Sequence, residues 1–267
     1  MLPVQLIVNA DDFGFTRDVN EGIVEAHERG ILTATTLMAN GNAFGHAVEL
    51  AQRAPSLDVG CHLVMVQGYS VLKPAVRLPA TFRQLLSALA GREIRPVEEA
   101  RAQVKKILDA GIRISHIDSH KHTHLLPPVM DAVLCVSQEF GIPWVRRPFD
   151  FELDAGVSLQ QQAVTLGMRM LRPSFTRKLA GLRTTDHFTG FQKTGSLDTA
   201  SLQTILERLP EGTTELMCHP GRHGSELARA ATRLKQSRAV ELAALTSLEA
   251  REVVARRRIR LISYRDL

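Results

Sequence analysis

Residues 116–124 read His-Ile-Asp-Ser-His-Lys-His-Thr-His, which places four of the chain's ten histidines and one carboxylate in nine residues. An apolar run precedes this stretch and Leu-Leu-Pro-Pro follows it, as at the end of a buried strand. Imidazole and carboxylate groups are common ligands of zinc and related ions, so the stretch predicts a metal site rather than a solvated polar loop. In an extended segment alternate side chains share a face, and five side chains are therefore expected to point one way: His116, Asp118, His120, His122 and His124.

The composition is that of an ordinary globular protein, with 44% hydrophobic and 23% charged residues among 267. The formal net charge of +5 raises the question of nucleic acid or an anionic membrane surface as a partner. The basic residues are scattered except for the triplet at 256–258, where positive charge suits the end of a helix. We therefore expect no nucleic-acid partner, while transient contact with a membrane surface stays open.

The N-terminal residues lack a basic leader before their apolar run, and no apolar stretch approaches the roughly 18 residues that a membrane span needs. We therefore expect a cytoplasmic protein without a membrane span. The three cysteines, Cys61, Cys135 and Cys218, show no Cys-x-x-Cys spacing, so neither a disulfide framework nor a thiolate zinc site is expected.

Strand-like and helix-like segments alternate along the chain. Strand patterns occupy residues 4–8, 33–38, 58–65, 144–146, 213–218 and 259–262, with a strand end at 184–187. Helical patterns occupy residues 19–29, 44–53, 97–109, 129–140, 202–208 and 239–256, and residues 159–180 predict one long helix or two. Residues 66–80 have little periodicity and predict a long loop. The alternation predicts an α/β fold, an irregular (β/α) barrel that is TIM-barrel-like and forms a single domain over residues 1–267.

Polar motifs directly follow four of these strand patterns: Asp11-Asp12, His62, His120 and His219. Barrels of this kind build their sites at the carboxyl ends of the strands. We therefore expect the four motifs to meet in one pocket.

Asp11 and Asp12 are neighbours in sequence, and two close carboxylates are not both stable as anions unless a cation lies beside one of them. One is therefore expected to bind a metal, and the other to act as a base on a nearby water molecule. The alternative is that they cap the following helix, a common use of aspartate.

The two isolated strand-end histidines have different surroundings. Strand alternation sends Cys61 and His62 to opposite faces, so only one can face the pocket, and the alternative for His62 is a hydrogen-bonded place in the core. His219 precedes Pro220-Gly221, which force a turn and hold the ring at the rim. There it could donate a proton to a leaving group, stabilise an oxyanion or cap the turn.

Together these motifs resemble the YdjC-like carbohydrate deacetylases, a family that includes the ChbG and HpnK types. The matching pieces keep the family's order and span nearly the whole chain: residues 8–14, 30–36, 60–63, 116–124, 217–221 and 263–266. The resemblance implies a barrel that uses one divalent metal ion to remove acetyl groups from N-acetylated sugars. Mg²⁺ or Zn²⁺ is the expected ion, and two histidines with one aspartate would also accept Mn²⁺, Co²⁺ or Fe²⁺. The resemblance also implies these site residues: Asp12, His62 and His120 as metal ligands, Asp11 as general base and His219 as general acid.

The remaining histidines of the stretch are assigned by their position. His122 and His124 share the face of His120 and are expected to contact substrate hydroxyls or to support the metal ligands from behind. His116 lies deeper, with Asp118, in a structural role.

The substrate is expected to contain N-acetylglucosamine. The ChbG type implies a soluble chito-oligosaccharide, and the HpnK type implies an acetylglucosaminyl lipid reached from the membrane surface. The family also suggests a homodimer. Aromatic residues between 144 and 191 could line an apolar groove or belong to the core.

Two other functions fit parts of the sequence. A metal-dependent phosphoester hydrolase would also need Asp and His at strand ends, with a basic clamp that Arg146, Arg147 and Arg222 could supply. A non-enzymatic basic binding protein is the second alternative, and the complete set of polar strand-end residues argues against it.

Overall fold

The computed structural model describes residues 3–153, 156–179 and 181–267. The strands are β1 (Val4–Phe13), β2 (Ala34–Leu37), β3 (Asp58–Leu63), β4 (His116–Ser119), β5 (Trp144–Val145), β6 (His187–Thr189), β7 (Gly212–Cys218) and β8 (Arg260–Leu261). The α-helices are α1 (Arg17–Arg29), α2 (Phe44–Arg53), α3 (Phe82–Ala90), α4 (Pro96–Asp109), α5 (Pro127–Phe140), α6 (Leu159–Met170), α7 (Arg172–Lys178), α8 (Thr199–Glu207), α9 (Ser225–Arg229), α10 (Gln236–Thr246) and α11 (Leu248–Arg256). Two short 3-10 helices are η1 (His120–Leu125) and η2 (Tyr264–Asp266).

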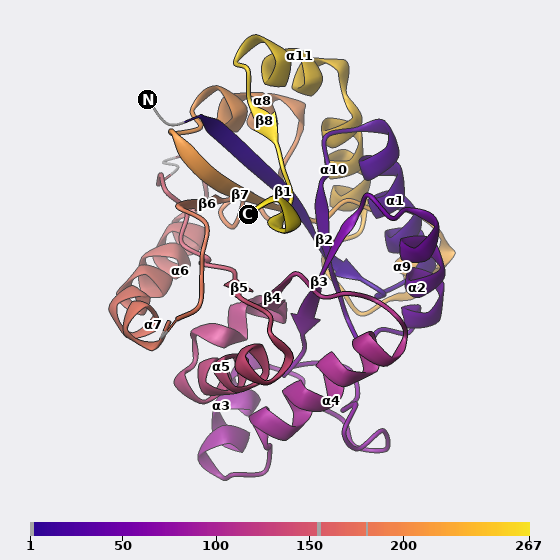
Figure 1. Ribbon diagram of the computed structural model, residues 1–267, viewed down its shortest axis with the longest axis vertical. Coiled ribbons are helices and arrows are strands. Elements are labelled where there is room, and N and C mark those ends of the chain that lie inside the picture. The colour runs from indigo at the N-terminus through magenta and orange to yellow at the C-terminus, as the bar shows by residue number, and fades with distance from the viewer. Residues whose placement is uncertain (1–2, 154–155, 180) are drawn as a thin grey trace.

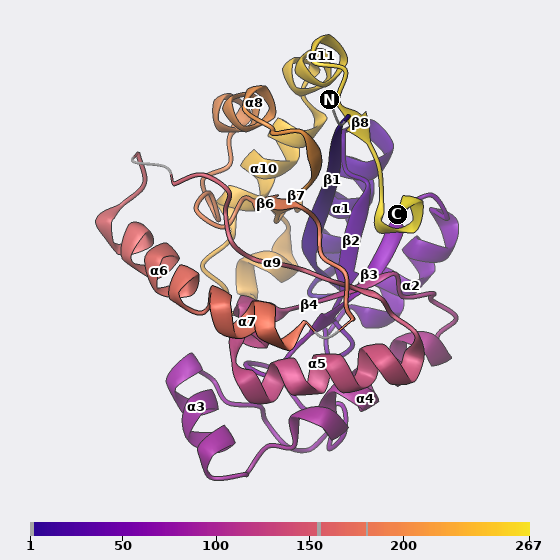
Figure 2. The same cartoon turned by 60° about the vertical axis from the view of Figure 1, so that its left-hand side comes forward.

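The strands form one parallel sheet in the order β5-β4-β3-β2-β1-β7-β6, with β8 paired to β1. Two isolated parallel bridges, Trp144 to Arg183 and Asp150 to Phe188, link the segments around its two edge strands. The sheet therefore curves toward closure, and helices surround its outer side (Figures 1 and 2). This arrangement confirms the predicted irregular (β/α) barrel-like fold.

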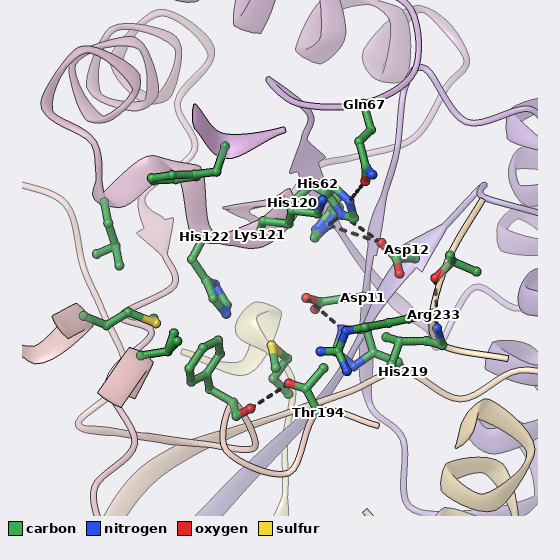
Figure 3. A pocket seen from close by; sticks show the side chains of 18 of the residues that line it. Asp11, Asp12, His62, Gln67, His120, Lys121, His122, Thr194, His219 and Arg233 are labelled. Carbon is green, nitrogen blue, oxygen red and sulfur yellow. Dashed lines mark hydrogen bonds and ion pairs between the residues drawn. The ribbon is translucent and has the colours of Figure 1, made fainter. Parts of the chain in front are cut away.

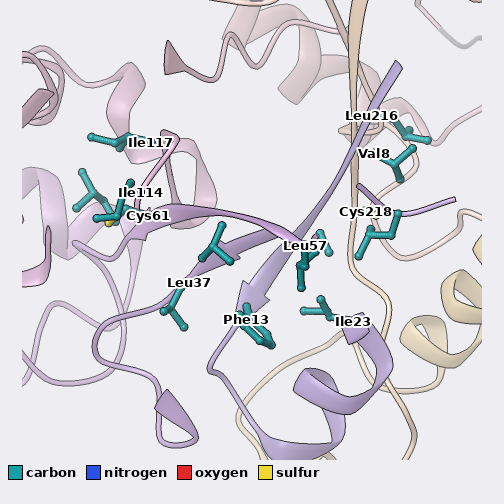
Figure 4. Close-up of a cluster of buried hydrophobic side chains, with 14 of the residues drawn as sticks. Val8, Phe13, Ile23, Leu37, Leu57, Cys61, Ile114, Ile117, Leu216 and Cys218 are labelled. Atoms are coloured by element: carbon teal, nitrogen blue, oxygen red, sulfur yellow. The ribbon is translucent and has the colours of Figure 1, made fainter. Parts of the chain in front are cut away.

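An apolar core lies between the sheet and these helices (Figure 4). Alternate residues of β1, such as Leu6 and Val8, enter this core, whereas Ile7 packs on the inner side of the sheet against Tyr264. Cys61 of β3 also belongs to the core, and all three cysteines are free. The expected separation of Cys61 from its neighbour on the inner face is therefore confirmed.

Most helix ends follow local signals. α2 has the predicted bounds, and α4 begins with Pro96 in its first turn. The long segment at 159–180 forms two helices, α6 and α7, and Ala180 lies outside the described residues. The segment at 239–256 is divided by Ser247, whose side chain caps α11.

Helix α3 has no counterpart among the predicted helices. Thr81 and Gln84 form a capping box at its start, so a sequence signal for this helix was present. In the described part of the chain no helix has both the length and the apolarity needed to cross a membrane.

Candidate metal and catalytic site

The carboxyl end of β1 presents two adjacent aspartates to one cavity. Ordinary strand alternation would send Asp11 and Asp12 to opposite faces. The pairing of β1 with β2 shifts between Ala10 and Phe13, and Asp12 has a left-handed backbone with a φ of 69°. This irregularity redirects the Asp12 side chain, so that both carboxylates line the cavity.

Asp12 meets two histidines from neighbouring elements (Figure 3). Its Oδ1 lies 3.5 Å from Nε2 of His62, in β3, and 3.3 Å from Nδ1 of His120, the first residue of η1. The ligand atoms of these three residues all lie within 4.8 Å of one another. One carboxylate and two imidazoles form a donor set that could hold a divalent metal ion and leave further positions open.

Neighbouring polar groups orient the two imidazoles. Nδ1 of His62 lies 2.7 Å from Oδ1 of Asp118, and Nε2 of His120 lies 3.1 Å from Oε1 of Gln67. Each ring therefore turns its other nitrogen toward Asp12, in the way that metal-ligating imidazoles are usually held.

The same carboxylates affect the pKa of His62. Burial would lower this pKa, but Asp118 and the two aspartates of β1 raise it to about 9.

Asp11 is held by a fully buried arginine. Arg146, which directly follows β5, donates hydrogen bonds from Nη1 to Oδ2 at 2.8 Å and from Nη2 to Oδ1 at 2.6 Å. The same guanidinium contacts Asp118 at 2.6 Å and Glu215 at 2.8 Å. Burial would raise the pKa of Asp11, but Arg146 outweighs burial and holds this pKa well below its usual value. Asp11 is therefore ionised at neutral pH.

His219 directly follows β7 and approaches Asp11 from the other side. Its Nε2 lies 3.8 Å from Oδ2 of Asp11, and its backbone N–H donates to the buried Glu241. Burial lowers the pKa of His219 to about 4, although Asp11 and Asp12 act in the opposite sense. The ring is therefore neutral at pH 7, and it borders the cavity.

A second buried arginine, Arg238 in α10, pairs with Oδ2 of Asp12. Burial would raise the pKa of Asp12, but Arg238, followed by the neighbouring histidines, holds it well below its usual value. Because Arg238 contacts Oδ2, Oδ1 stays directed at His62 and His120. The two adjacent aspartates therefore have separate guanidinium partners.

The histidine stretch does not continue as a strand. β4 ends at Ser119, and η1 follows with left-handed backbone at Lys121 (φ 55°) and His122 (φ 52°). The expectation that five side chains share one face is therefore wrong, because this turn takes the later residues out of the strand's alternation.

The last two histidines of the stretch lie in different places. His122 lines the cavity beside Phe191, with ring centroids 5.3 Å apart. His124 is fully buried, with Nδ1 2.7 Å from Oγ of Ser119 and Nε2 3.2 Å from the backbone oxygen of Arg146. His124 is not among the described residues that line the cavity, so its position does not support the predicted contact with substrate.

A cavity of about 740 Å³ lies in front of these groups. One end is polar and holds both aspartates with His62, His120 and His219. The rest of the wall is largely apolar and includes Phe15, Leu125, Met168, Leu171, Phe191 and Leu234. Phe191 therefore belongs to the cavity, whereas Phe149, Phe175 and Phe188 are buried in the protein.

Some polar residues of the site were not predicted in these positions: Gln67, Arg146 and Arg238. Arg146 follows a strand, which is the signal that identified the aspartates and histidines, but the sequence offered it as part of a phosphate clamp. It is instead enclosed by three carboxylates, and Arg222 pairs with two glutamates near the surface. These arginines therefore do not form the clamp that a phosphoester hydrolase would need.

The fold and site define an α/β protein with a buried Asp-His cluster, suited to one metal ion, at the carboxyl ends of its parallel strands. The chain belongs to the YdjC-like family, because the family model described as YdjC-like protein matches residues 5–256.

Similar proteins cover nearly the full length of this chain. A carbohydrate deacetylase of Brevibacillus brevis is 33% identical over 99% of this chain and 100% of its own length. A carbohydrate deacetylase of Geobacillus stearothermophilus is 32% identical over 99% of this chain and 98% of its own. A crystal structure from Enterococcus faecalis, named for a proposed cellobiose-phosphate cleavage activity, is 25% identical with a TM-score of 0.76, covering 99% of this chain and 98% of that one.

Proposed function

We propose that this protein is a metal-dependent carbohydrate deacetylase that hydrolyses the N-acetyl group of an N-acetylglucosamine-containing carbohydrate or glycolipid. The observation that carries the proposal is the meeting of two sets of groups on one cavity: the cluster of Asp12, His62 and His120, and the pair of Asp11 and His219. The similar proteins named carbohydrate deacetylase support the choice of reaction.

One divalent ion, Zn²⁺ or Mg²⁺, would be held by Asp12, His62 and His120. The residues fit such an ion because the outer nitrogens of both imidazoles and the outer oxygen of Asp12 already have partners, which leaves one atom of each facing the others. When bound, the ion would polarise the acetyl carbonyl and lower the pKa of a water molecule.

Asp11 would act as the general base. Its carboxylate is ionised, and Arg146 fixes it in place through one hydrogen bond to each oxygen. Asp11 would take a proton from water as the oxygen of that water bonds to the acetyl carbon. The C–N bond then breaks, which gives acetate and a free amino sugar.

His219 would return a proton to the departing nitrogen. Because the imidazole is neutral at rest, the proton that it delivers is the one that Asp11 takes from water. The 3.8 Å separation between Asp11 Oδ2 and His219 Nε2 places the two groups close enough for this transfer with a small movement of either side chain.

The cavity suits a substrate with a polar and an apolar part. His122 borders the polar end of the cavity and would contact a sugar hydroxyl. His124 does not line the cavity and would support this part of its wall through its contact with Ser119. The largely apolar remainder favours a sugar that carries an apolar group over a purely hydrophilic oligosaccharide.

Acetate release tests the proposal. With purified protein and either di-N-acetylchitobiose or an N-acetylglucosaminyl lipid, we expect release that a chelator abolishes and that added Zn²⁺ or Mg²⁺ restores. Asp11→Asn should lower the rate by at least about 100-fold. Asp109→Asn, at an exposed aspartate in α4, is the matched control and should not change it. Metal-loaded protein that releases no acetate from either substrate would contradict the proposal.

A further inference from the structure

Two segments of the chain lack acidic residues altogether. Residues 59–92 contain four basic residues and no Asp or Glu, and residues 156–185 contain five basic residues and no Asp or Glu. Of the fourteen large hydrophobic side chains that are exposed in the described part of the chain, ten lie in these two segments. Exposed apolar side chains and net positive charge therefore occur in the same two segments, because neither segment has an acidic residue to offset its basic ones.

Helix α6 has two apolar faces. Val164, Met168 and Leu171, at its end, line the cavity. A second row with helical spacing, Leu159, Leu166 and Met170, points outward and is 83%, 59% and 78% exposed. A surface helix of a globular protein normally has one apolar stripe, which faces the core. The outer stripe of α6 is therefore an exposed apolar face in this chain.

Helix α3 and helix α6 border the same cavity. Phe82 of α3 and Val164 of α6 both line it, and they are 42% and 46% exposed. Figure 2 shows both helices on the same side of the molecule, with α7 continuing from α6. Exposed apolar side chains of both helices therefore border the cavity. The exposed apolar side chains of α3, of the loop before it and of α6 are here called the α3/α6 face.

Positive charge lies beside the apolar side chains of this face. Arg83 follows Phe82 in α3, and Arg172 and Arg177 are exposed in α7. Exposed apolar side chains flanked by arginines, with no acidic residue in either segment, complement the interface of an anionic bilayer. A second copy of the chain fits less well, because a two-fold contact would place the same basic segment against itself.

We propose that the α3/α6 face docks on the surface of an anionic lipid bilayer. Docking in this way turns the mouth of the cavity toward the lipid, so that an acetylated sugar enters from the membrane rather than from water. The docking itself does not depend on the reaction, whereas the delivery of a lipid-linked sugar rests on the proposed deacetylase function.

Vesicle flotation without any substrate tests the docking. Full-length protein is mixed with vesicles of phosphatidylcholine alone, or of phosphatidylcholine with about one quarter phosphatidylglycerol. We expect flotation with the anionic vesicles at low salt and at least about tenfold weaker binding to the neutral ones, because the arginines contribute only where the surface is negative. No flotation with anionic vesicles, or equal binding to both compositions, would overturn the proposal.

Paired variants locate the docking face. Leu166→Asp combined with Met170→Asp should weaken binding to anionic vesicles by at least about tenfold, since both side chains point outward and neither lines the cavity. Leu248→Asp is the matched control, because Leu248 in α11 is 65% exposed and lies outside both segments.

Circular dichroism and the Tm should be unchanged in both variants, which shows that the double variant is folded and keeps the docking test independent of catalysis. Equal loss of vesicle binding in both variants would overturn the assignment of the face. A shift from dimer to monomer in the double variant would also overturn it, because it would identify a second copy of the chain as the occupant.

Discussion

Asp11 and Asp12 acquire different roles through their partners. Arg146 donates a hydrogen bond to each oxygen of Asp11. Arg238 contacts only one oxygen of Asp12, and the other oxygen faces His62 and His120. Each carboxylate is buried, so its charge depends on the guanidinium beside it. The free oxygen of Asp12 therefore supports its proposed role as metal ligand, and the two hydrogen bonds from Arg146 support the proposed role of Asp11 as general base.

Arg146 should therefore be essential for stability. We expect Arg146→Met to lower the free energy of unfolding by about 3–5 kcal/mol, because it leaves buried carboxylates without their cation. Urea denaturation followed by circular dichroism measures the change. Arg172→Met, at an exposed position, is the control and should alter stability by less than about 0.5 kcal/mol. Similar effects of the two substitutions would contradict the role given to the buried network.

Asp150 should make stability depend on pH. Its carboxylate accepts hydrogen bonds from the backbone N–H groups of Phe191 and Gln192, and burial raises its pKa from 3.8 to about 6. The folded protein then binds this proton more tightly than the unfolded chain, so the stability that protonation provides at low pH is lost as pH rises through 6.

Asp150→Asn removes this titration. Between pH 4 and pH 7 we expect the free energy of unfolding of the unmodified protein to fall by about 2–3 kcal/mol relative to that of the variant. Urea denaturation at a series of pH values measures the difference. A difference that stays constant with pH would show that Asp150 does not titrate in this range.

At the scale of elements, β3 packs tightly against the side chain of His116 in β4. A Cβ atom added at Gly60 would lie 2.5 Å from the His116 ring, which stacks on Tyr264 at a centroid distance of 3.9 Å. We expect Gly60→Ala to lower the free energy of unfolding by about 1–3 kcal/mol, since the stacked rings must shift. Gly45→Ala is the control: nothing lies within 4 Å of the added atom, and this helical position should gain up to about 1 kcal/mol. Thermal unfolding of both variants decides between these outcomes.

Elements with local start and stop signals could be predicted from the sequence. The bounds of α2 and α4 agree with their periodicity and, for α4, with Pro96 in the first turn. The turn at η1 could not be predicted, because one of its left-handed residues, His122, packs against Phe188 and Phe191, which are distant in the sequence. Without that turn, the histidine stretch looks like a continuous strand.

The proposed metal ligands could be predicted from the sequence, whereas the arginines beside them could not. Asp12 and His62 lie at the carboxyl ends of β1 and β3, and His120 directly follows β4; the carboxyl ends of these parallel strands meet at one edge of the sheet. The arginine partners could not be predicted, since Arg146 and Arg238 lie 135 and 226 residues from the aspartates that they contact. Only the folded chain brings these charges together.

At the scale of the whole molecule, the site combines residues that are far apart in the sequence. Asp12, His62 and His120 come from β1, β3 and η1, so an ion that they share links segments that would separate on unfolding. An ion that binds only the folded state must stabilise it. We expect saturating Zn²⁺ to raise the Tm of chelator-treated protein by about 5 °C or more, measured by calorimetry. An unchanged Tm would contradict a metal site in the folded protein.

We propose that Asp12 binds the metal ion and that Asp11 acts as the base. A titration of Zn²⁺ into chelator-treated protein tests this assignment most directly. Asn suits the left-handed backbone at position 12, so Asp12→Asn should fold, as circular dichroism can check. We expect one ion per chain for the unmodified protein and for Asp11→Asn, and binding at least about 100-fold weaker for Asp12→Asn. Equal loss of binding in both variants, or loss in Asp11→Asn alone, would contradict the account.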